Sequence, residues 1–373
     1  MINLVSEMIS KKVMKMDVSG VRRMFELASK LKNPIDLTIG LPDFDVPSEV
    51  KEEAIKAIRE GKNRYTKTAG IDELKEKIIK KYEKEKIDVK NEQIIITSAG
   101  SGALSIILTT IIEKDDEVLI FDPYFVSYKQ LVIQNEGKPV FVNCNEDFSP
   151  DLEDLEKKIT PKTKAIIINS PNNPTGKVYS ENEMRKIAQI ADKNKLLVIS
   201  DEVYDEFCYD FPYFRISKIY KNTATINAFS KSHAMTGWRV GYLIARKDIV
   251  EQAIKVQQYN FVCAPTPFQH AALKAMDISI KNKIKEYKKK RDIIYEGLKN
   301  NYKFEKPEGA FYAFIEYPYD SEKFMKRCLD NELLVVPGNV FSERNTHFRI
   351  SFATSDETLK KAVEVLNLIS EEN

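Results

Sequence analysis

The sequence predicts an α/β fold built on a mainly parallel, wound sheet of seven strands. Seven short apolar runs recur along residues 93–244, and each is followed by a turn-rich or helical segment. Alternation of this kind is typical of α/β domains with parallel strands. At 373 residues the chain exceeds what one compact core usually holds. We therefore expect a large sheet domain accompanied by a smaller α+β domain.

The elements of the large domain follow in order along the chain. Ser48, which follows Pro47, is expected to cap a helix that runs to about residue 61, and residues 71–85 carry apolar side chains on one helical face. The seven predicted strands are Gln93–Thr97, Glu117–Phe121, Pro139–Val142, Ala165–Asn169, Leu196–Ser200, Ala224–Ala228 and Val240–Ile244.

The rest of the chain predicts a linker and the smaller domain. A long charged helix is expected from about residue 266 to residue 300. Beyond Pro307 the pattern indicates strands at 310–315, 333–336 and 348–351, a helix after the first of them, and a C-terminal helix. We assign the N-terminal segment 1–46 and residues 286–373 to the small domain, and residues 47–285 to the large one.

Composition excludes several classes of function. The chain has 58 Lys+Arg and 56 Asp+Glu, which leaves no charge excess to drive binding to nucleic acid or to an anionic membrane. No apolar run is long enough to span a bilayer, and the first 19 residues lack the core of a signal peptide. The four cysteines form no C-x-x-C pair, and the three histidines have no metal-site spacing. We therefore expect a cytoplasmic protein without a metal.

The segment Phe229–Tyr242 carries the most informative motif of the chain. It places Lys231 and Arg239 on a short loop with two glycines, between two apolar runs. A lysine attacks a carbonyl only when burial or a nearby cation lowers its pKa, and Arg239 is a candidate for that cation. Arginine is also the planar fork that suits a phosphate. A lysine that forms a Schiff base beside a phosphate-binding arginine is what a pyridoxal phosphate enzyme needs.

Other candidate groups follow the ends of predicted strands, where α/β sheets bind ligands. The turn Ser98–Gly102 opens a helix, whose free N–H groups suit a phosphate, although such a turn is more often a plain connection. The segment Pro171–Gly176 favours a rigid turn when it is taken alone. Asp201 ends the next strand, where a carboxylate either caps the following segment or serves a ligand.

Together and in this order, the motifs resemble class I, fold type I, pyridoxal phosphate-dependent aminotransferases. Lys231 with Gly237-Trp238-Arg239 is similar to the cofactor-lysine signature of that family, and Asn173-Pro174-Thr175-Gly176 is similar to its N-P-T-G motif. The resemblance extends from Gly40 to Arg349, over nearly the whole chain. It looks closest to the branch that contains aspartate and aromatic-amino-acid aminotransferases.

The resemblance implies roles for the matching residues. Lys231 would hold pyridoxal 5'-phosphate as a Schiff base and move the Cα proton of the substrate. Asp201 would pair with the protonated ring nitrogen, which keeps the ring an electron sink, and Tyr204 would bind the ring oxygen. These three are the implied catalytic residues. The other implied cofactor contacts are Gly100, Ser101, Phe125, Asn173, Ser230 and Arg239.

The resemblance also implies a homodimer and a substrate site. Tyr65 matches the tyrosine that reaches the cofactor phosphate of the neighbouring subunit, so the active sites would be shared across the interface. Arg349 matches the arginine that binds the substrate carboxylate, and Gly40 and Asn173 would lie beside that group.

The predicted activity is transfer of an amino group between an amino acid, aspartate or aromatic, and 2-oxoglutarate. Ser101 stands where aspartate enzymes often carry a lysine for the second substrate carboxylate, so the donor stays open. Two alternatives share the framework. One is a pyridoxal phosphate lyase that acts at Cβ. The other is a cofactor-sensing module of a transcription regulator, for which the residues before Gly40 are too few to form a DNA-binding domain.

Overall fold

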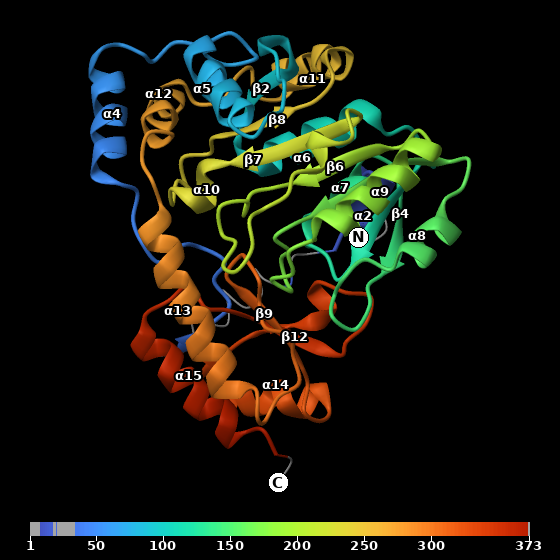
Figure 1. Ribbon diagram of the computed structural model, residues 1–373, viewed down its shortest axis with the longest axis vertical. Helices are drawn as coiled ribbons and strands as arrows, with labels where there is room; N and C mark the ends of the chain where they lie inside the picture. The colour runs from blue at the N-terminus through green and yellow to red at the C-terminus, as the bar shows by residue number, and fades with distance from the viewer. Residues whose placement is uncertain (1–7, 18–19, 21–33, 372–373) are drawn as a thin grey trace.

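A computed structural model describes residues 8–17, 20 and 34–371, which form a large α/β domain and a smaller α+β domain (Figure 1). The large sheet has seven strands in the order β2-β8-β7-β6-β5-β3-β4. Strand β8 is antiparallel to both of its neighbours, whereas the other pairs are parallel. The predicted fold is confirmed. The strands are β2 Ile94–Thr97, β3 Glu117–Asp122, β4 Lys138–Asn143, β5 Thr163–Asn169, β6 Leu197–Asp201, β7 Thr223–Ala228 and β8 Gly241–Ile244.

Helices cover both faces of this sheet, and this explains why apolar residues on its central strands occur at consecutive positions rather than at every second one. Ile167 of β5 lies in a core shared with α6 (Ala99–Ile111) and α11 (Lys247–Asn260). Its neighbours Ile166 and Ile168 point to the opposite face, into a core shared with α9 (Glu181–Lys193). The remaining helices of this part are α7 (Ser127–Gln134), α8 (Leu152–Lys158) and α10 (Phe229–Ser232).

The predicted helices near the start of the chain form, with one correction. They are α4 (Ser48–Arg59) and α5 (Asp72–Glu83). Ser48 is not the N-cap, because it is already the first helical residue and Pro47 precedes it in the capping position. The Ser48 hydroxyl donates to the Glu49 carboxylate at 3.0 Å instead of accepting from the helix backbone.

The single long helix predicted for residues 266–300 is wrong. The chain forms α12 (Thr266–Ala275) and α13 (Lys281–Leu298), separated by a short turn. The two helices bury different cores. Ala272 of α12 packs in the large domain with α4 and α5, whereas Ile294 of α13 packs in the small domain. The Asp-Ile-Ser-Ile sequence between them has weak helix propensity, so a break there costs little.

The small domain holds the strand order β11-β12-β9, covered by helices (Figure 1). The strand predicted at 333–336 is divided: β10 (Leu333–Leu334) pairs with β1 (Ile35–Asp36), while β11 (Val336–Pro337) pairs with β12 (His347–Ser351). Thus one short segment serves two sheets. The other elements are β9 (Tyr312–Glu316), α14 (Ser321–Asp330) and α15 (Asp356–Leu368).

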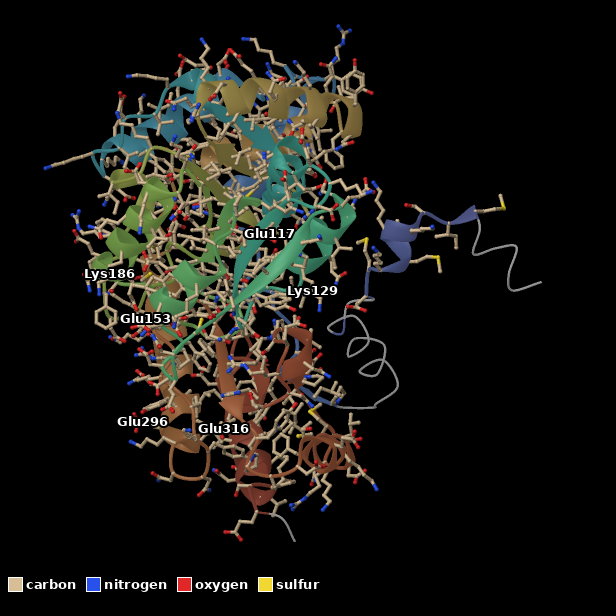
Figure 2. The ribbon with its side chains drawn as sticks, turned by 90° about the vertical axis from the view of Figure 1, so that its right-hand side faces the viewer. Glu117, Lys129, Glu153, Lys186, Glu296 and Glu316 are labelled. Carbon is tan, nitrogen blue, oxygen red and sulfur yellow. The ribbon has the colours of Figure 1, made fainter. Side chains whose placement is uncertain are left out.

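The proposed domain boundary after residue 285 falls inside α13, which therefore connects the two domains as a continuous helix. Figure 2 shows α2 (Lys11–Met14) beside the large domain, on the side that carries Lys129. Just after α2, the Asp17 backbone N–H donates to the Gln130 side chain at 3.0 Å. No helix in the part of the chain that the structure describes is long and apolar enough to cross a membrane.

Candidate active site

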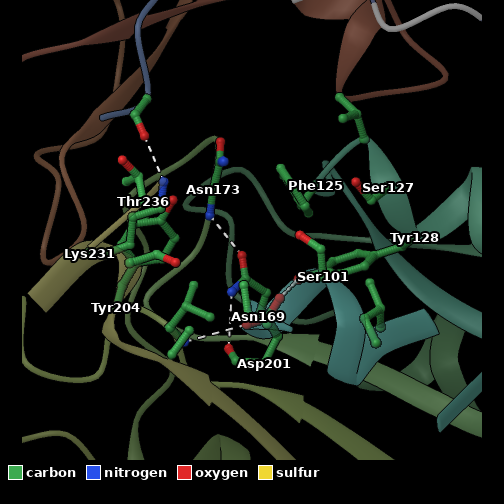
Figure 3. A pocket seen from close by; sticks show the side chains of 18 of the residues that line it. Ser101, Phe125, Ser127, Tyr128, Asn169, Asn173, Asp201, Tyr204, Lys231 and Thr236 are labelled. Atoms are coloured by element: carbon green, nitrogen blue, oxygen red, sulfur yellow. Dashed lines mark hydrogen bonds between the residues drawn. The ribbon is translucent and has the colours of Figure 1, made fainter. Parts of the chain in front are cut away.

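A cavity of about 470 Å³ lies at the carboxyl ends of β5, β6 and β7, where α/β sheets bind ligands (Figure 3). It is lined by every site residue predicted from the sequence except Tyr65. These residues are Gly40, Gly100, Ser101, Phe125, Asn173, Asp201, Tyr204, Ser230, Lys231, Arg239 and Arg349. Segments far apart in the chain therefore converge on one site.

Lys231 is the nucleophile candidate of this cavity. It lies in α10, a single turn that directly follows β7, and its Nζ donates to the Gly40 carbonyl at 2.7 Å. Burial, together with the charges of Arg349 and Arg239, lowers the pKa of Lys231 to about 8. Arg239 thus acts as the neighbouring cation that the sequence suggested, but burial and Arg349 have larger effects.

Asp201, the last residue of β6, is buried in the same cavity. Burial raises the pKa of its carboxyl and two hydrogen bonds oppose this rise, so that the pKa is about 6. The Tyr128 hydroxyl donates to Oδ2 at 2.7 Å, and the Val203 backbone N–H donates to Oδ1 at 3.4 Å. The sequence did not identify Tyr128 as a site residue, because nothing in its spacing shows that α7 brings it to Asp201.

A hydrogen-bonded chain links Asp201 to Arg349 through two asparagines. Asn169, at the end of β5, donates to the Asp201 carbonyl at 3.0 Å and accepts from the Asn173 N–H at 2.9 Å. Arg349 donates to Asn173 Oδ1 at 3.1 Å and to the Thr38 carbonyl at 2.7 Å. The bond from Arg349 leaves the Asn173 amide nitrogen as a donor. Sequence analysis missed Asn169, although its place opposite Asp201 in the sheet register follows from two adjacent strands.

Arg349 is almost fully buried and one of its donors is unused. Its guanidinium lies 4.6 Å from the ring centre of Tyr312 and 4.5 Å from that of Phe341. Among the described residues, Nε has no hydrogen-bond partner. Since a buried N–H without a partner is costly, this donor marks where a polar ligand is expected.

Tyr312, which sequence analysis also missed, shapes the floor near Lys231. Its hydroxyl and that of Tyr204 lie 2.8 Å apart. A Cβ on Gly40 would come within 2.6 Å of the Tyr312 hydroxyl, so this position has no space for a side chain. Gly40 therefore brings its carbonyl close enough to bind Lys231.

The turn into α6 forms a cradle at the other end of the cavity. The first N–H groups of a helix have no partner within it, and Gly100 and Ser101 line the cavity at this end. Ala99 and Arg239, which also line it, adopt left-handed φ values of 61° and 56°. Non-glycine residues rarely adopt this conformation, and such strain is concentrated at functional sites.

The donor set fits a phosphorylated aromatic aldehyde. An amine with a pKa near 8 suits the aldehyde, and a buried carboxylate suits a protonated ring nitrogen. The phenol of Tyr204 and the amide of Asn173 suit the ring oxygen. The helix N-terminus and Arg239 suit the phosphate.

Tyr65 is the one predicted site residue outside the cavity. Its side chain is 79% exposed on the surface of the described chain. It makes no contribution to the site within one subunit.

Comparison with known proteins agrees with this geometry. The aminotransferase class I and II family model matches residues 32–366. The chain is 41% identical to a protein of Methanocaldococcus jannaschii named "Probable aspartate aminotransferase", over 98% of this chain and 100% of that protein. It is 36% identical to aromatic-amino-acid aminotransferase 2 of Thermococcus litoralis, over 98% of each.

The solved structure of aspartate aminotransferase from Thermotoga maritima superimposes with a TM-score of 0.94. That pair is 35% identical and covers 97% of this chain and 100% of the other. Such agreement in sequence and fold extends over both domains. The chain therefore belongs to the aminotransferase class I and II family, whose members carry out pyridoxal phosphate-dependent transamination.

Proposed function

We propose that this chain binds pyridoxal 5'-phosphate and transfers amino groups between an amino acid, aspartate or aromatic, and 2-oxoglutarate. One observation carries the proposal: the buried amine of Lys231, with a pKa of about 8, shares a cavity with the Asp201 carboxylate and the unused donor of Arg349. When bound, pyridoxal phosphate supplies the carbonyl that takes up the amino group and the ring that accepts the electrons of the broken Cα–H bond.

The residues of the chain bind, orient and move protons around this group. Asp201 keeps a negative charge beside the ring nitrogen, so that the nitrogen stays protonated. Lys231, freed when the substrate amine takes its place, would remove the proton from the substrate Cα and deliver it to the cofactor carbon that carries the amino group. Because its pKa is about 8, roughly a tenth of this amine is the free base at pH 7, far more than for a lysine with the ordinary pKa of 10.5.

Arg349 orients the substrate. Its guanidinium offers N–H groups to the α-carboxylate that all substrates of the reaction share. The bonds from Arg349 to Asn173 and Thr38 hold the guanidinium in place before a substrate arrives. A fixed carboxylate lets the breaking Cα–H bond stand perpendicular to the ring.

The substrate side chain meets little positive charge. Within the described part of the chain, the cationic residues lining the cavity are Lys231, Arg239 and Arg349, and all three have other tasks in the proposal. Ser101 offers a hydroxyl where a lysine would pair with a second carboxylate. Loss of one charged hydrogen bond costs about 1.5–3 kcal/mol, or roughly ten- to a hundred-fold in specificity. We therefore expect phenylalanine or tyrosine to be used at least as well as aspartate.

The test is half-reaction spectroscopy of the purified protein against a panel of amino acids. Each accepted donor should convert the cofactor to its amine form, and 2-oxoglutarate should convert it back. Lys231→Ala should abolish both steps and remove the cofactor that borohydride fixes to the chain. Cofactor fixed to another lysine would overturn the assignment, and release of a Cβ substituent without amine transfer would favour the lyase alternative.

Steady-state kcat/KM values then decide the preferred donor. Aspartate above every aromatic amino acid by more than about a hundred-fold would mean that a residue other than Ser101 supplies the carboxylate contact. Ser101→Lys should raise kcat/KM for aspartate relative to phenylalanine by roughly ten-fold or more.

A further inference from the structure

We propose that Tyr128 is a positioning residue for Asp201: its hydroxyl fixes the orientation of the carboxylate and favours the charged form on which the ring nitrogen depends. This inference rests on the proposed function, because it assigns Asp201 its partner in the protein. Tyr128 donates to the carboxylate, and it acts on the reaction through Asp201 rather than by contact with the reacting atoms.

The geometry of the pair is specific. Tyr128 is the second residue of α7 and lies in the cavity wall, with 2% of its surface exposed (Figure 3). Its hydroxyl donates to Asp201 Oδ2 at 2.7 Å, a length typical of hydrogen bonds to a charged acceptor. Its ring contacts Phe125 edge-on, with ring centres 5.6 Å apart. Phe125 and Tyr128 therefore pack against each other in the cavity wall.

The opposite oxygen of Asp201 has a weaker partner. Among the described residues, Oδ1 accepts only from the Val203 backbone N–H, at 3.4 Å. The positive charge of Lys231, across the cavity, lowers the pKa of Asp201. The negative charge of Asp201 in turn raises the pKa of the Tyr204 phenol. The bond from Tyr128 is thus the short one that holds the carboxylate in a fixed orientation.

The electrostatic effect follows from the direction of the hydrogen bond. Because the Tyr128 hydroxyl donates its hydrogen bond, it stabilises the ionised carboxylate. This opposes the rise in the pKa of Asp201 that burial causes. The phenol is itself locked in the protonated form, because burial and the charge of Asp201 raise its pKa well above the usual range. The donor is therefore available at any pH at which the protein works.

Tyr124 supplies a matched control. It lies four positions earlier in the chain, is also buried, and its hydroxyl donates to the Glu343 carboxylate at 2.6 Å. It does not line the cavity of Lys231. Tyr128→Phe and Tyr124→Phe each remove one hydroxyl from one tyrosine–carboxylate pair, and only the first pair belongs to the site.

The first experiment measures the thermal stability of the cofactor-free chain at pH 5 and pH 8. At pH 8 Asp201 is ionised, so Tyr128→Phe should lower the Tm by more than it does at pH 5, where the carboxyl is protonated. In an Asp201→Asn background the loss should be the same at both pH values. An equal loss at both pH values in the natural chain would show that the hydroxyl is merely structural.

The second experiment uses the holoenzyme. Tyr128→Phe should lower kcat by roughly ten- to a hundred-fold with KM nearly unchanged, and should shift the acid limb of the kcat/KM profile to higher pH. Tyr124→Phe should leave both unchanged. A variant Tyr128→Phe that matches Tyr124→Phe in kcat and in pH profile would overturn the inference.

The two proposals fail in different ways. If the proposed function is wrong, the natural holoenzyme transfers no amino group to 2-oxoglutarate from any donor. If only the inference on Tyr128 is wrong, the natural enzyme is active and the two phenylalanine variants are indistinguishable.

Discussion

At the scale of single residues, burial acts on the two central ionisable groups with opposite sign. It lowers the pKa of Lys231 to about 8 and raises that of Asp201 to about 6, because in each case it disfavours the charged form. The two values are thereby brought toward neutral pH from the ordinary values of an amine and a carboxylic acid. Ionisable groups shifted in this way are characteristic of active sites.

The shift of Lys231 predicts how fast the cofactor-free chain takes up pyridoxal phosphate. The rate should rise with pH through about 8, since only the free amine reacts. Arg349→Gln removes a nearby positive charge, so the pKa of Lys231 should increase and uptake at pH 7 should slow several-fold. Stopped-flow absorbance against pH measures this rate. Arg344→Gln, outside the cavity, is the control, and a midpoint unmoved by Arg349→Gln would contradict the electrostatic coupling.

The shift of Asp201 predicts a pH dependence of stability. Its pKa in the folded chain, about 6, exceeds the ordinary value of 3.8, so the folded state holds the proton more tightly and stability falls as pH rises between these values. Asp201→Asn should abolish this term, which is worth up to about 3 kcal/mol. In urea unfolding of the cofactor-free proteins, the free energy of unfolding of Asp201→Asn should therefore exceed that of the natural chain by the largest amount at pH 8.

The same variant should lower turnover of the holoenzyme by several orders of magnitude, because an amide does not keep the ring nitrogen protonated. Near-normal turnover of Asp201→Asn would refute the role proposed for the carboxylate.

At the scale of elements, the sequence predicted what depends on local pattern. The seven strands were identifiable because helices bury both faces, so each strand is a short apolar run. Two features could not be predicted from local pattern: the break between α12 and α13, and the division of the strand near Val335. In each case the two halves pack in different cores or pair in different sheets. Such choices depend on tertiary contacts rather than on periodicity.

The candidate site divides in the same way. Residues in dense local motifs, such as Asn173 and Lys231, were identifiable from their neighbours in the chain. Tyr128 and Tyr312 were missed because their partners lie 73 and 108 positions away. An isolated tyrosine is more often a core residue than a site residue, so only the three-dimensional structure assigns it to the cavity.

The junction of β8 with the turn into α6 predicts a sensitive glycine. A Cβ on Gly241 would lie 2.7 Å from the Ala99 carbonyl carbon and 2.9 Å from the Gly100 nitrogen, and both are backbone atoms that cannot move aside cheaply. Gly241→Ala should therefore destabilise the protein by about 1–3 kcal/mol and weaken cofactor binding through the α6 turn. Gly237→Ala, with nothing within 4 Å, is the control. Equal Tm and cofactor affinity in the two variants would contradict this packing argument.

At the scale of the whole molecule, the exposed aromatic side chains fit the homodimer that the sequence resemblance implies. Tyr65 is 79% exposed and Tyr259 is 87% exposed, values that are unusual for such large apolar rings. Their segments are tied together, since Gln257 donates to the Thr68 carbonyl at 2.6 Å and Thr266 to the Arg64 carbonyl at 2.7 Å. A second copy of the chain is the partner that would cover this surface in a symmetric dimer.

A shared active site predicts complementation between two defective variants. If Tyr65 serves the neighbouring subunit, a mixed dimer of Lys231→Ala and Tyr65→Ala has one site with both defects and one site with none. Mixing the two proteins under subunit exchange, at a limiting cofactor concentration, should therefore raise turnover above that of either variant alone. If Tyr65 served its own subunit, every site in the mixed dimer would keep a defect. If Tyr65 served no site, the Tyr65→Ala variant alone would be fully active. Turnover that stays at the average of the two variants would then exclude a site shared through Tyr65.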